Sequence, residues 1–314
     1  MNFYLAVTDI NWYNNLSKIN PEDVNFWQPG GRTNFRILSP GEPFLFKLKV
    51  HNVIGGVGFY FMQVFLPLTL AWETFGERNG FDTYSLFKRA IMNLRTDKDN
   101  PNPQIGCIVL TNPIFFNSKD WIPLPENWSS NIVQGKSYST SDTIGRACWD
   151  RVEVLLNEYL KDVPSNDMNS MVMQDPDSPI YRNSVLRKVR IGQGAFKVSI
   201  LDAYNKRCSI SGERTIPVLE AAHIKPYSEA GPNFIRNGLL LRSDIHKLFD
   251  TGYITITKDL KIEVSKRIRE EFENGREFII KMTGRICRYF LSEMRTTRLG
   301  IMWSGIMRMC TGDN

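Results

Sequence analysis

The 314-residue sequence lacks the features that define several broad classes of protein. Its five cysteines form no C-x-x-C pair, so we expect neither a disulfide-built scaffold nor a four-cysteine zinc ribbon, and a reducing compartment is favoured. No apolar run reaches the roughly 18 residues that a membrane span needs. The longest run, around Phe59–Leu70, is interrupted by Gln63 and Pro67. The first residues also lack the basic region of a secretory signal. These absences predict a cytoplasmic protein with no membrane contact.

The composition that remains is typical of a folded chain with two domains of ordinary size, because 42% of the residues are hydrophobic and 23% are charged. The charge is uneven along the chain. Residues 1–160 hold 14 Lys and Arg against 15 Asp and Glu, whereas residues 182–247 hold 12 against 5. Such a concentration of positive charge is typical of a polyanion-binding surface. A basic, solvated face is the alternative interpretation from charge alone.

The first 140 residues read as short strands between Gly, Pro and Asn turns, which favours a small β-barrel with one or two helices. Asp142 is expected to cap a further helix that runs to Leu160. Residues 161–181 are polar and contain three prolines, so they are interpreted as a flexible linker. The strands are expected at Phe3–Val7, Pro43–Val50, Val57–Leu66 and Ile105–Leu110, and a helix at Tyr84–Leu94.

The second half is expected to contain a helix, a strand, a second helix and a hairpin, in that order. The first helix carries Phe196 and Tyr204, and Val218–Ile224 is the strand. We expect Asn237 to cap the second helix, which would run to Phe249. The hairpin would follow between residues 253 and 264.

Histidine is scarce, and two of the three histidines, His223 and His246, lie 23 residues apart in the basic half. Asp250 is one helical turn after His246, so both side chains project from one face. An imidazole beside a carboxylate can share a divalent cation that keeps positions open for substrate. The amide of Asn237 can hydrogen-bond the backbone across the loop and hold the strand that ends at His223.

The run AAHIKPYSEAGPNFIRNGLLLRSDIHKLFDTGYITI resembles the HNH nuclease motif on a ββα-metal fold. This resemblance implies that His223 is the general base that activates water, that Asn237 takes the Asn place of the motif, and that His246 binds one divalent ion, Mg²⁺. The implied reaction is hydrolysis of a phosphodiester. A base that titrates near neutral pH and a cation at the leaving oxygen are what this chemistry requires.

The sequence departs from many HNH sites at Ala222, because that position often carries a metal ligand and alanine cannot ligate. Asp250 is the candidate replacement, and Glu220 is the next candidate. Some relatives also carry paired C-x-x-C zinc knuckles. Here Cys208 has Ser211 in the partner place, so we predict no structural zinc.

Basic residues before and within the motif are expected to contact DNA phosphates without reading the base sequence. A solvated face remains the alternative. The expected phosphate contacts are Arg187, Lys188, Arg190, Lys197, Lys225 and Arg242.

Two tryptophans of the first half, Trp27 and Trp72, lie in glycine-containing segments that read as loops. They could form a slot for a flat ligand, or they could be core residues of the barrel. The segments PGEPFLFK, IGGVGFY, AWETFG, IGCIVLTNPIFF and NIVQGKSY resemble an EVE domain, a PUA-like barrel related to the YTH readers of modified bases. The resemblance implies that Trp27 and Trp72 sandwich a flipped base, with Phe35 and Ser39 as further pocket candidates.

Together the two resemblances predict an α+β protein with an EVE/PUA-like reader at 1–140, a helix and linker at 141–186 and an HNH nuclease domain at 187–290. They imply a bacterial, modification-dependent restriction endonuclease that flips 5-methylcytosine or 5-hydroxymethylcytosine out of double-stranded DNA. One HNH site cuts one strand, so a homodimer is expected for double-strand cleavage. The alternatives are a non-catalytic reader of modified DNA with a degenerate nuclease domain, and a reader of modified RNA.

The tail at 291–314 departs from the pattern of relatives, since it carries Met302, Met307 and Met309 within eight residues. A frameshifted tail and an ordinary helix with a Met-rich face are the two interpretations that remain.

Overall fold

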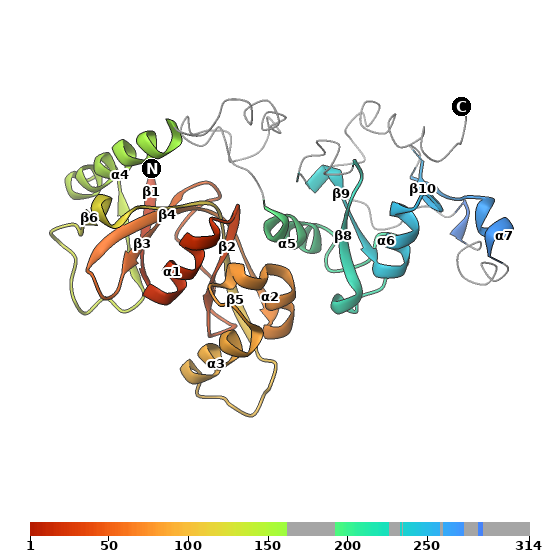
Figure 1. Ribbon diagram of the computed structural model, residues 1–314, viewed down its shortest axis with the longest axis horizontal. Helices are drawn as coiled ribbons and strands as arrows, with labels where there is room; N and C mark the ends of the chain where they lie inside the picture. Colours follow the sequence, from red (N-terminus) through yellow and green to blue (C-terminus); the bar gives the residue numbers. More distant parts are fainter. Residues whose placement is uncertain (162–191, 226–232, 234, 258–259, 273–281, 285–314) are drawn as a thin grey trace. The chain divides into compact units, whose positions relative to one another are not determined.

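The computed structural model describes residues 1–161, 192–225, 233, 235–257, 260–272 and 282–284 (Figure 1). The chain divides into two compact units, Met1–Ala195 and Phe196–Asn314. Residues 162–181 of the linker expected at 161–181 lie outside the described residues. The same holds for the expected phosphate contacts Arg187, Lys188 and Arg190 and for the atypical tail. Among the described helices, none has the length and apolar character to cross a bilayer.

The first unit is built on a seven-stranded sheet with the hydrogen-bonded order β2-β5-β4-β3-β1-β7, and β6 pairs with β4. The pair β1–β3 is parallel, and the other pairs are antiparallel. The sequence predicts a barrel, in which the strands would close into a ring. The hydrogen-bonded order of the described strands runs instead from β2 at one end to β7 at the other. The strands are β1 (Asn2–Thr8), β2 (Asp23–Gln28), β3 (Pro43–Leu48), β4 (Val53–Pro67), β5 (Gln104–Phe115), β6 (Ile122–Pro123) and β7 (Gly135–Ser139).

The helices of this unit are α1 (Ile10–Ile19), α2 (Leu68–Phe75), α3 (Tyr84–Leu94) and α4 (Thr143–Lys161). Helix α3 has the predicted bounds. The Asp142 cap of α4 is confirmed, because its carboxylate Oδ1 accepts the Gly145 N–H at 2.7 Å. Helix α1 was not expected, since three of its ten residues are asparagine, a weak helix former. The Asp9 carboxylate caps the start of this helix, because it accepts the N–H groups of Asn11 and Trp12.

Both faces of this sheet are buried, and β1 shows how. Successive side chains of a strand point to opposite faces. Phe3 and Leu5 pack in one apolar cluster with Trp149 of α4, whereas Tyr4 packs in a second cluster with Trp12 of α1. Helices α1 and α4 therefore cover different faces of the sheet (Figure 1).

The second unit contains two short antiparallel pairs, β8–β9 and β10–β11. Helix α6 follows β9 directly and lies beside both β8 and β9 (Figure 1). In the β8–β9 register, His223 is opposite Gly238 and Ala222 is opposite Leu239. The elements are α5 (Gln193–Ala203), which begins in the first unit, β8 (Leu219–His223), β9 (Gly238–Arg242), α6 (Ser243–Asp250), β10 (Ile254–Ile256), β11 (Ile262–Val264) and α7 (Arg267–Glu271).

The expected helix from Asn237 to Phe249 was wrong in its first half. Asn237 ends a short 3₁₀ turn, Gly238–Arg242 is strand β9, and the helix begins only at Ser243. The run Leu239–Leu241 is completely buried. A short apolar run has no periodicity that separates strand from helix, and here pairing with β8 decides for the strand. The result is a strand, strand, helix unit.

Candidate active site

His223 ends strand β8, and two side chains hold its partly buried ring. Its Nε2 lies 2.7 Å from the side-chain oxygen Oδ1 of Asn233. The ring of Phe196 stacks on the imidazole with a centroid separation of 4.2 Å and an interplanar angle of 14°. Sequence patterns missed both partners, because Phe196 reads only as an apolar helix residue and Asn233 as a loop residue.

Asn237 is fully buried and hydrogen-bonds to the backbone beyond His223. Its Oδ1 accepts the Lys225 N–H at 2.9 Å, and its Nδ2 donates to the Lys225 carbonyl at 3.2 Å. Its own carbonyl accepts the Ile224 N–H at 2.8 Å. The sequence predicts such backbone hydrogen bonds across the loop, and the structure shows them. Asn237 therefore acts on the position of the strand end.

His246 lies on α6 between two carboxylates. Its Nδ1 is 2.6 Å from Glu220 Oε2, and its Nε2 is 3.3 Å from Asp250 Oδ2. The structure thus brings the three candidate metal residues together. The two carboxylates approach different nitrogens, however, so the three side chains do not converge on one point. Accordingly, the described residues contain no cluster of three or more His, Cys, Asp or Glu side chains arranged to hold a metal ion. Ala222 is fully buried and supplies no ligand.

The ligand atoms around His246 are suited to a divalent cation held by two protein side chains. A neutral imidazole has one N–H and one lone pair, and metal-binding histidines commonly donate the N–H to a carboxylate. The separation of 3.3 Å between Nε2 and Asp250 Oδ2 is close to the ~3 Å between adjacent ligands of an octahedral Mg²⁺ with ~2.1 Å bonds. Mg²⁺ typically keeps several water ligands, so two protein ligands are a common number.

The three described phosphate candidates differ in their surroundings. Lys197 on α5 and Lys225 after β8 are both half-buried. The Arg242 guanidinium forms two hydrogen bonds of 2.7 Å with the Asp244 carboxylate. This pair raises the pKa of Arg242 and lowers the pKa of Asp244. A phosphate at Arg242 would therefore compete with Asp244.

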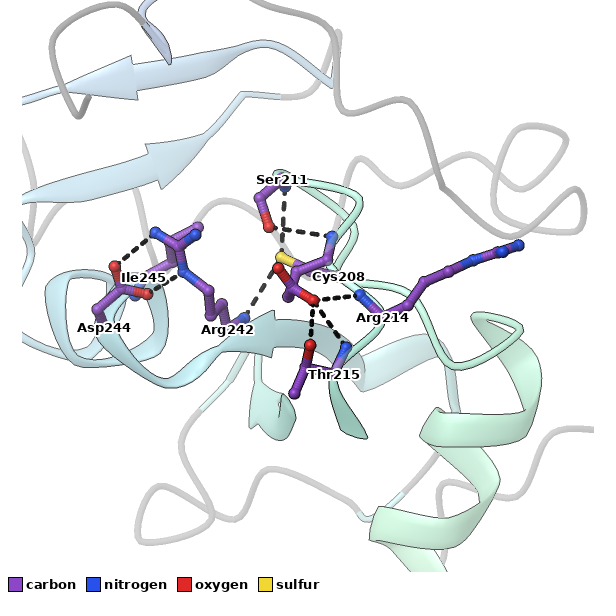
Figure 2. A network of polar contacts seen from close by, with 8 residues as sticks. Cys208, Ser211, Arg214, Thr215, Arg242, Asp244 and Ile245 are labelled. Carbon is purple, nitrogen blue, oxygen red and sulfur yellow. Dashed lines mark hydrogen bonds and ion pairs between the residues drawn. The ribbon is translucent and has the colours of Figure 1, made fainter. Parts of the chain in front are cut away.

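Cys208 is buried at a tight turn. Its Sγ accepts the N–H of Ser211 at 3.4 Å and the N–H of Arg242 at 3.3 Å (Figure 2). On the same turn, the Glu213 carboxylate accepts the N–H of Thr215 at 2.7 Å. Backbone hydrogen bonds to sulfur and to a carboxylate therefore close this turn in the described structure.

The expectation that Trp27 and Trp72 lie in loops was wrong. Trp27 is on β2, where it pairs with Cys107 of β5, and Trp72 is on α2. Both tryptophans are half-buried, and each contacts the ring of Phe87, at 6.2 Å from Trp27 and 6.0 Å from Trp72. Phe87 is fully buried on α3. The two tryptophans thus belong to one aromatic cluster around Phe87, which consists of Trp27, Trp72, Phe81, Tyr84 and Phe87.

The two further pocket candidates lie in different surroundings. Phe35 is 9% exposed, and its ring contacts Tyr4, Phe44 and Tyr60 at 5.1, 5.9 and 5.4 Å. Ser39 is exposed, and its N–H donates to the Glu42 carboxylate at 2.8 Å. None of the ring contacts of the described residues joins Phe35 to either tryptophan. Phe35 is therefore a core residue in this structure.

Comparison with known proteins assigns the second unit's central segment. Residues 208–257 match the HNH_2 family model, described as HNH endonuclease, so the chain contains an HNH endonuclease domain. This segment includes β8, β9 and α6 with His223, Asn237 and His246. HNH nucleases generally use a divalent metal.

The structure is also similar to solved ASCH structures from Zymomonas mobilis. The ASCH protein is 10% identical over 46% of this chain and 94% of its own, with a TM-score of 0.33. A point mutant of the same protein is 9% identical over 47% of this chain and 95% of its own, also with a TM-score of 0.33. The likeness is too low to support a statement about function. No curated protein matches the sequence.

Proposed function

We propose that this protein is a nuclease that cleaves double-stranded DNA carrying modified cytosine, with the first unit as the reader and the HNH domain as the catalyst. The observation that carries the proposal is the strand, strand, helix unit itself. It presents His223 at the end of β8 and His246 on the adjoining α6, with Asn237 fixing the backbone beyond β8. Residues of these types at this spacing serve phosphodiester hydrolysis.

In this proposal His223 is the general base. An imidazole that is partly exposed at a strand end can reach a water molecule and accept its proton as the water attacks phosphorus. The ring is already oriented by Asn233 and Phe196, so little reorganisation is needed before proton transfer.

We propose that His246 Nε2 and Asp250 hold the cation, and that Glu220 accepts the Nδ1–H and orients the ring. Glu220 is then a neighbour of the metal site, although the sequence favours it as a possible ligand. When bound, Mg²⁺ would stabilise the charge that develops on the phosphate and on the leaving oxygen.

The first unit is proposed to read 5-methylcytosine or 5-hydroxymethylcytosine after base flipping. Support comes from Trp27 of β2 and Trp72 of α2, since both residues are only partly buried. Because both rings contact Phe87, we propose that the base stacks on an exposed ring face in this cluster. Domain limits near residues 140 and 187 belong to the same proposal.

A homodimer is proposed for double-strand cleavage, since one HNH site serves one strand. We also propose a bacterial, cytoplasmic setting, as the resemblance to restriction enzymes implies. A non-catalytic reader is a second candidate. It is favoured by one observation, the fully buried Ala222 at a common ligand position.

Cleavage of matched DNA duplexes tests the proposal. Unmodified, 5-methylcytosine and 5-hydroxymethylcytosine duplexes of one sequence are incubated with the full chain and Mg²⁺, with EDTA as control. We expect Mg²⁺-dependent cleavage of a modified duplex and little of the unmodified one. Selective binding without cleavage would support the non-catalytic reader, and equal cleavage of all three would remove the reader function.

A further inference from the structure

We propose that Asn233 and Phe196 are positioning residues for His223: Asn233 selects the tautomer of the imidazole, and Phe196 fixes the plane of its ring. This inference rests on the proposed role of His223 as general base. Neither residue belongs to the three motif positions, and they lie 10 and 27 positions from His223 in the sequence.

Asn233 can select the tautomer because its contact atom is an acceptor. A side-chain carbonyl oxygen has lone pairs and no proton, so with Oδ1 facing the ring the 2.7 Å contact favours the proton on His223 Nε2. Asn233 is 8% exposed, which keeps this oxygen from turning freely to water. In the neutral ring, a proton on Nε2 leaves the lone pair on Nδ1. We therefore expect Nδ1 to be the atom that accepts the proton of water.

The same hydrogen bond supports the ring after proton transfer. When Nδ1 gains the proton from water, the ring becomes an imidazolium, and its Nε2–H remains directed at Asn233 Oδ1. Hydrogen bonds from a charged donor are stronger than those between neutral groups. Asn233 therefore stabilises the ring more after proton transfer than before it, which is the direction that favours catalysis.

Phe196 can fix the ring plane because its own position is tightly constrained. It is 2% exposed, and it packs against β9 where Gly238 has no side chain. A Cβ on Gly238 would lie 2.9 Å from Phe196 Cζ and 2.3 Å from Ile200 Cδ1, too close for either atom. Gly238 is also the residue opposite His223 in the β8–β9 pair. The glycine thus lets α5 approach the pair and places Phe196 flat against the imidazole.

The test combines a spectroscopic readout with cleavage kinetics on the full chain. The protein is labelled with ¹⁵N at histidine, and since it has only three histidines, His223 is assigned by comparison with His223→Ala. Long-range ¹H–¹⁵N spectra then show which ring nitrogen carries the proton in the wild type, in Asn233→Ala and in Asn233→Asp. We expect the Nε2–H tautomer in the wild type and in Asn233→Asp, and a mixture in Asn233→Ala.

Cleavage of the duplex that the wild type cuts fastest in Mg²⁺ gives the second readout. We expect Asn233→Ala to lower kcat by about 10-fold or more with KM for DNA unchanged. Asn233→Asp keeps the acceptor and adds a charge that favours the imidazolium. Its activity should therefore recover at high pH, with the acidic limb of the kcat profile shifted upward. Phe196→Leu should lower kcat while leaving the tautomer unchanged.

Two results would overturn the inference. One is a His223 tautomer that is Nδ1–H in the wild type or unaffected by Asn233→Ala. The other is an equal loss of kcat in Asn233→Ala and Asn233→Asp with the wild-type pH profile, as a purely structural role would give. Absence of wild-type cleavage, by contrast, would contradict the proposed nuclease function, and the tautomer spectra would still decide the role of Asn233.

Discussion

The side-chain amide of Asn237 forms a closed pair of hydrogen bonds with the backbone of Lys225, at 2.9 Å to its N–H and 3.2 Å to its carbonyl. Asn237 immediately precedes β9, and Lys225 lies two residues beyond His223. One buried side chain therefore fixes the distance between the strand that ends at the proposed base and the strand that leads into α6. We therefore expect Asn237 to affect both the stability of the domain and its cleavage of DNA.

Replacing Asn237 by alanine should destabilise the HNH domain and abolish cleavage. The change leaves the partly buried N–H and carbonyl of Lys225 without their partner, which costs about 1–3 kcal/mol. Urea unfolding followed by far-UV circular dichroism measures the loss. Glu263→Ala, which changes an exposed side chain on β11 of the same unit, is the control and should change neither property. Full stability of Asn237→Ala would show that water replaces both hydrogen bonds.

The two carboxylates beside His246 should respond differently to neutralisation. Asp250→Asn should weaken Mn²⁺ or Mg²⁺ binding by about 10-fold to 100-fold. Glu220→Gln should have a smaller effect, because the glutamine oxygen still accepts the Nδ1–H. Titration calorimetry of the full chain measures both, with Asp202→Asn on the exposed face of α5 as control. The reverse order of effects would make Glu220 the ligand.

How much of this site the sequence predicts depends on whether the signal is local. The spacing of His246 and Asp250 on one helix turn is a local signal, and the structure brings these two side chains together. The spacing of the apolar residues in Tyr84–Leu94 is also local, and the structure has a helix with these bounds. Strand β9 was missed because Leu239–Leu241 is apolar without interruption and becomes a strand only by pairing with β8. Strand β2 was missed for a related reason, since Pro29 and two glycines next to Trp27 favoured a loop.

Contacts between distant segments carry the remaining information, and no sequence pattern contains them. Phe196 and His223 are stacked although 27 residues separate them in the sequence. Phe87, on α3, meets both Trp27 of β2 and Trp72 of α2. The sequence left the two tryptophans as either pocket walls or core residues. In the structure both tryptophans are half-buried, which is compatible with either interpretation.

Alanine at Trp27 or Trp72 should reduce the preference for modified DNA. Loss of base–aromatic stacking costs about 1–3 kcal/mol per base, so the ratio of modified to unmodified binding should fall by about 5-fold to 150-fold. Binding to both duplexes is measured by fluorescence anisotropy. Trp128→Ala is the matched control, because Trp128 is also half-buried but packs in the cluster around α4. An unchanged ratio in both variants would place the base pocket elsewhere.

Alkaline conditions should destabilise the first unit through its buried thiols. Burial raises the pKa of Cys107 to about 12 and the pKa of Cys148 to about 11. An unfolded thiol ionises at about 8.5, so the unfolded state loses protons first as the pH rises. The stability that the neutral thiols contribute is complete below pH ~8.5 and is lost between that pH and the folded pKa values. Each thiol can contribute a slope of up to about 1.4 kcal/mol per pH unit.

Urea unfolding at pH 8, 9 and 10 measures this slope in the wild type and in Cys148→Ala. Tryptophan fluorescence reports mainly on the first unit, because six of the seven tryptophans precede residue 150. We expect the variant to be less stable than the wild type at pH 8, with a difference that shrinks as the pH rises. Parallel pH profiles would mean that Cys148 ionises as readily in the folded protein as in the unfolded one.

The most direct measurement of the central claim is cleavage by His223→Ala beside its affinity for the same modified duplex. If His223 is the base that activates water, the variant binds the duplex with wild-type affinity and cuts it at least about 100-fold more slowly at saturating Mg²⁺. Mg²⁺-dependent cleavage by His223→Ala at a rate close to that of the wild type would contradict the account.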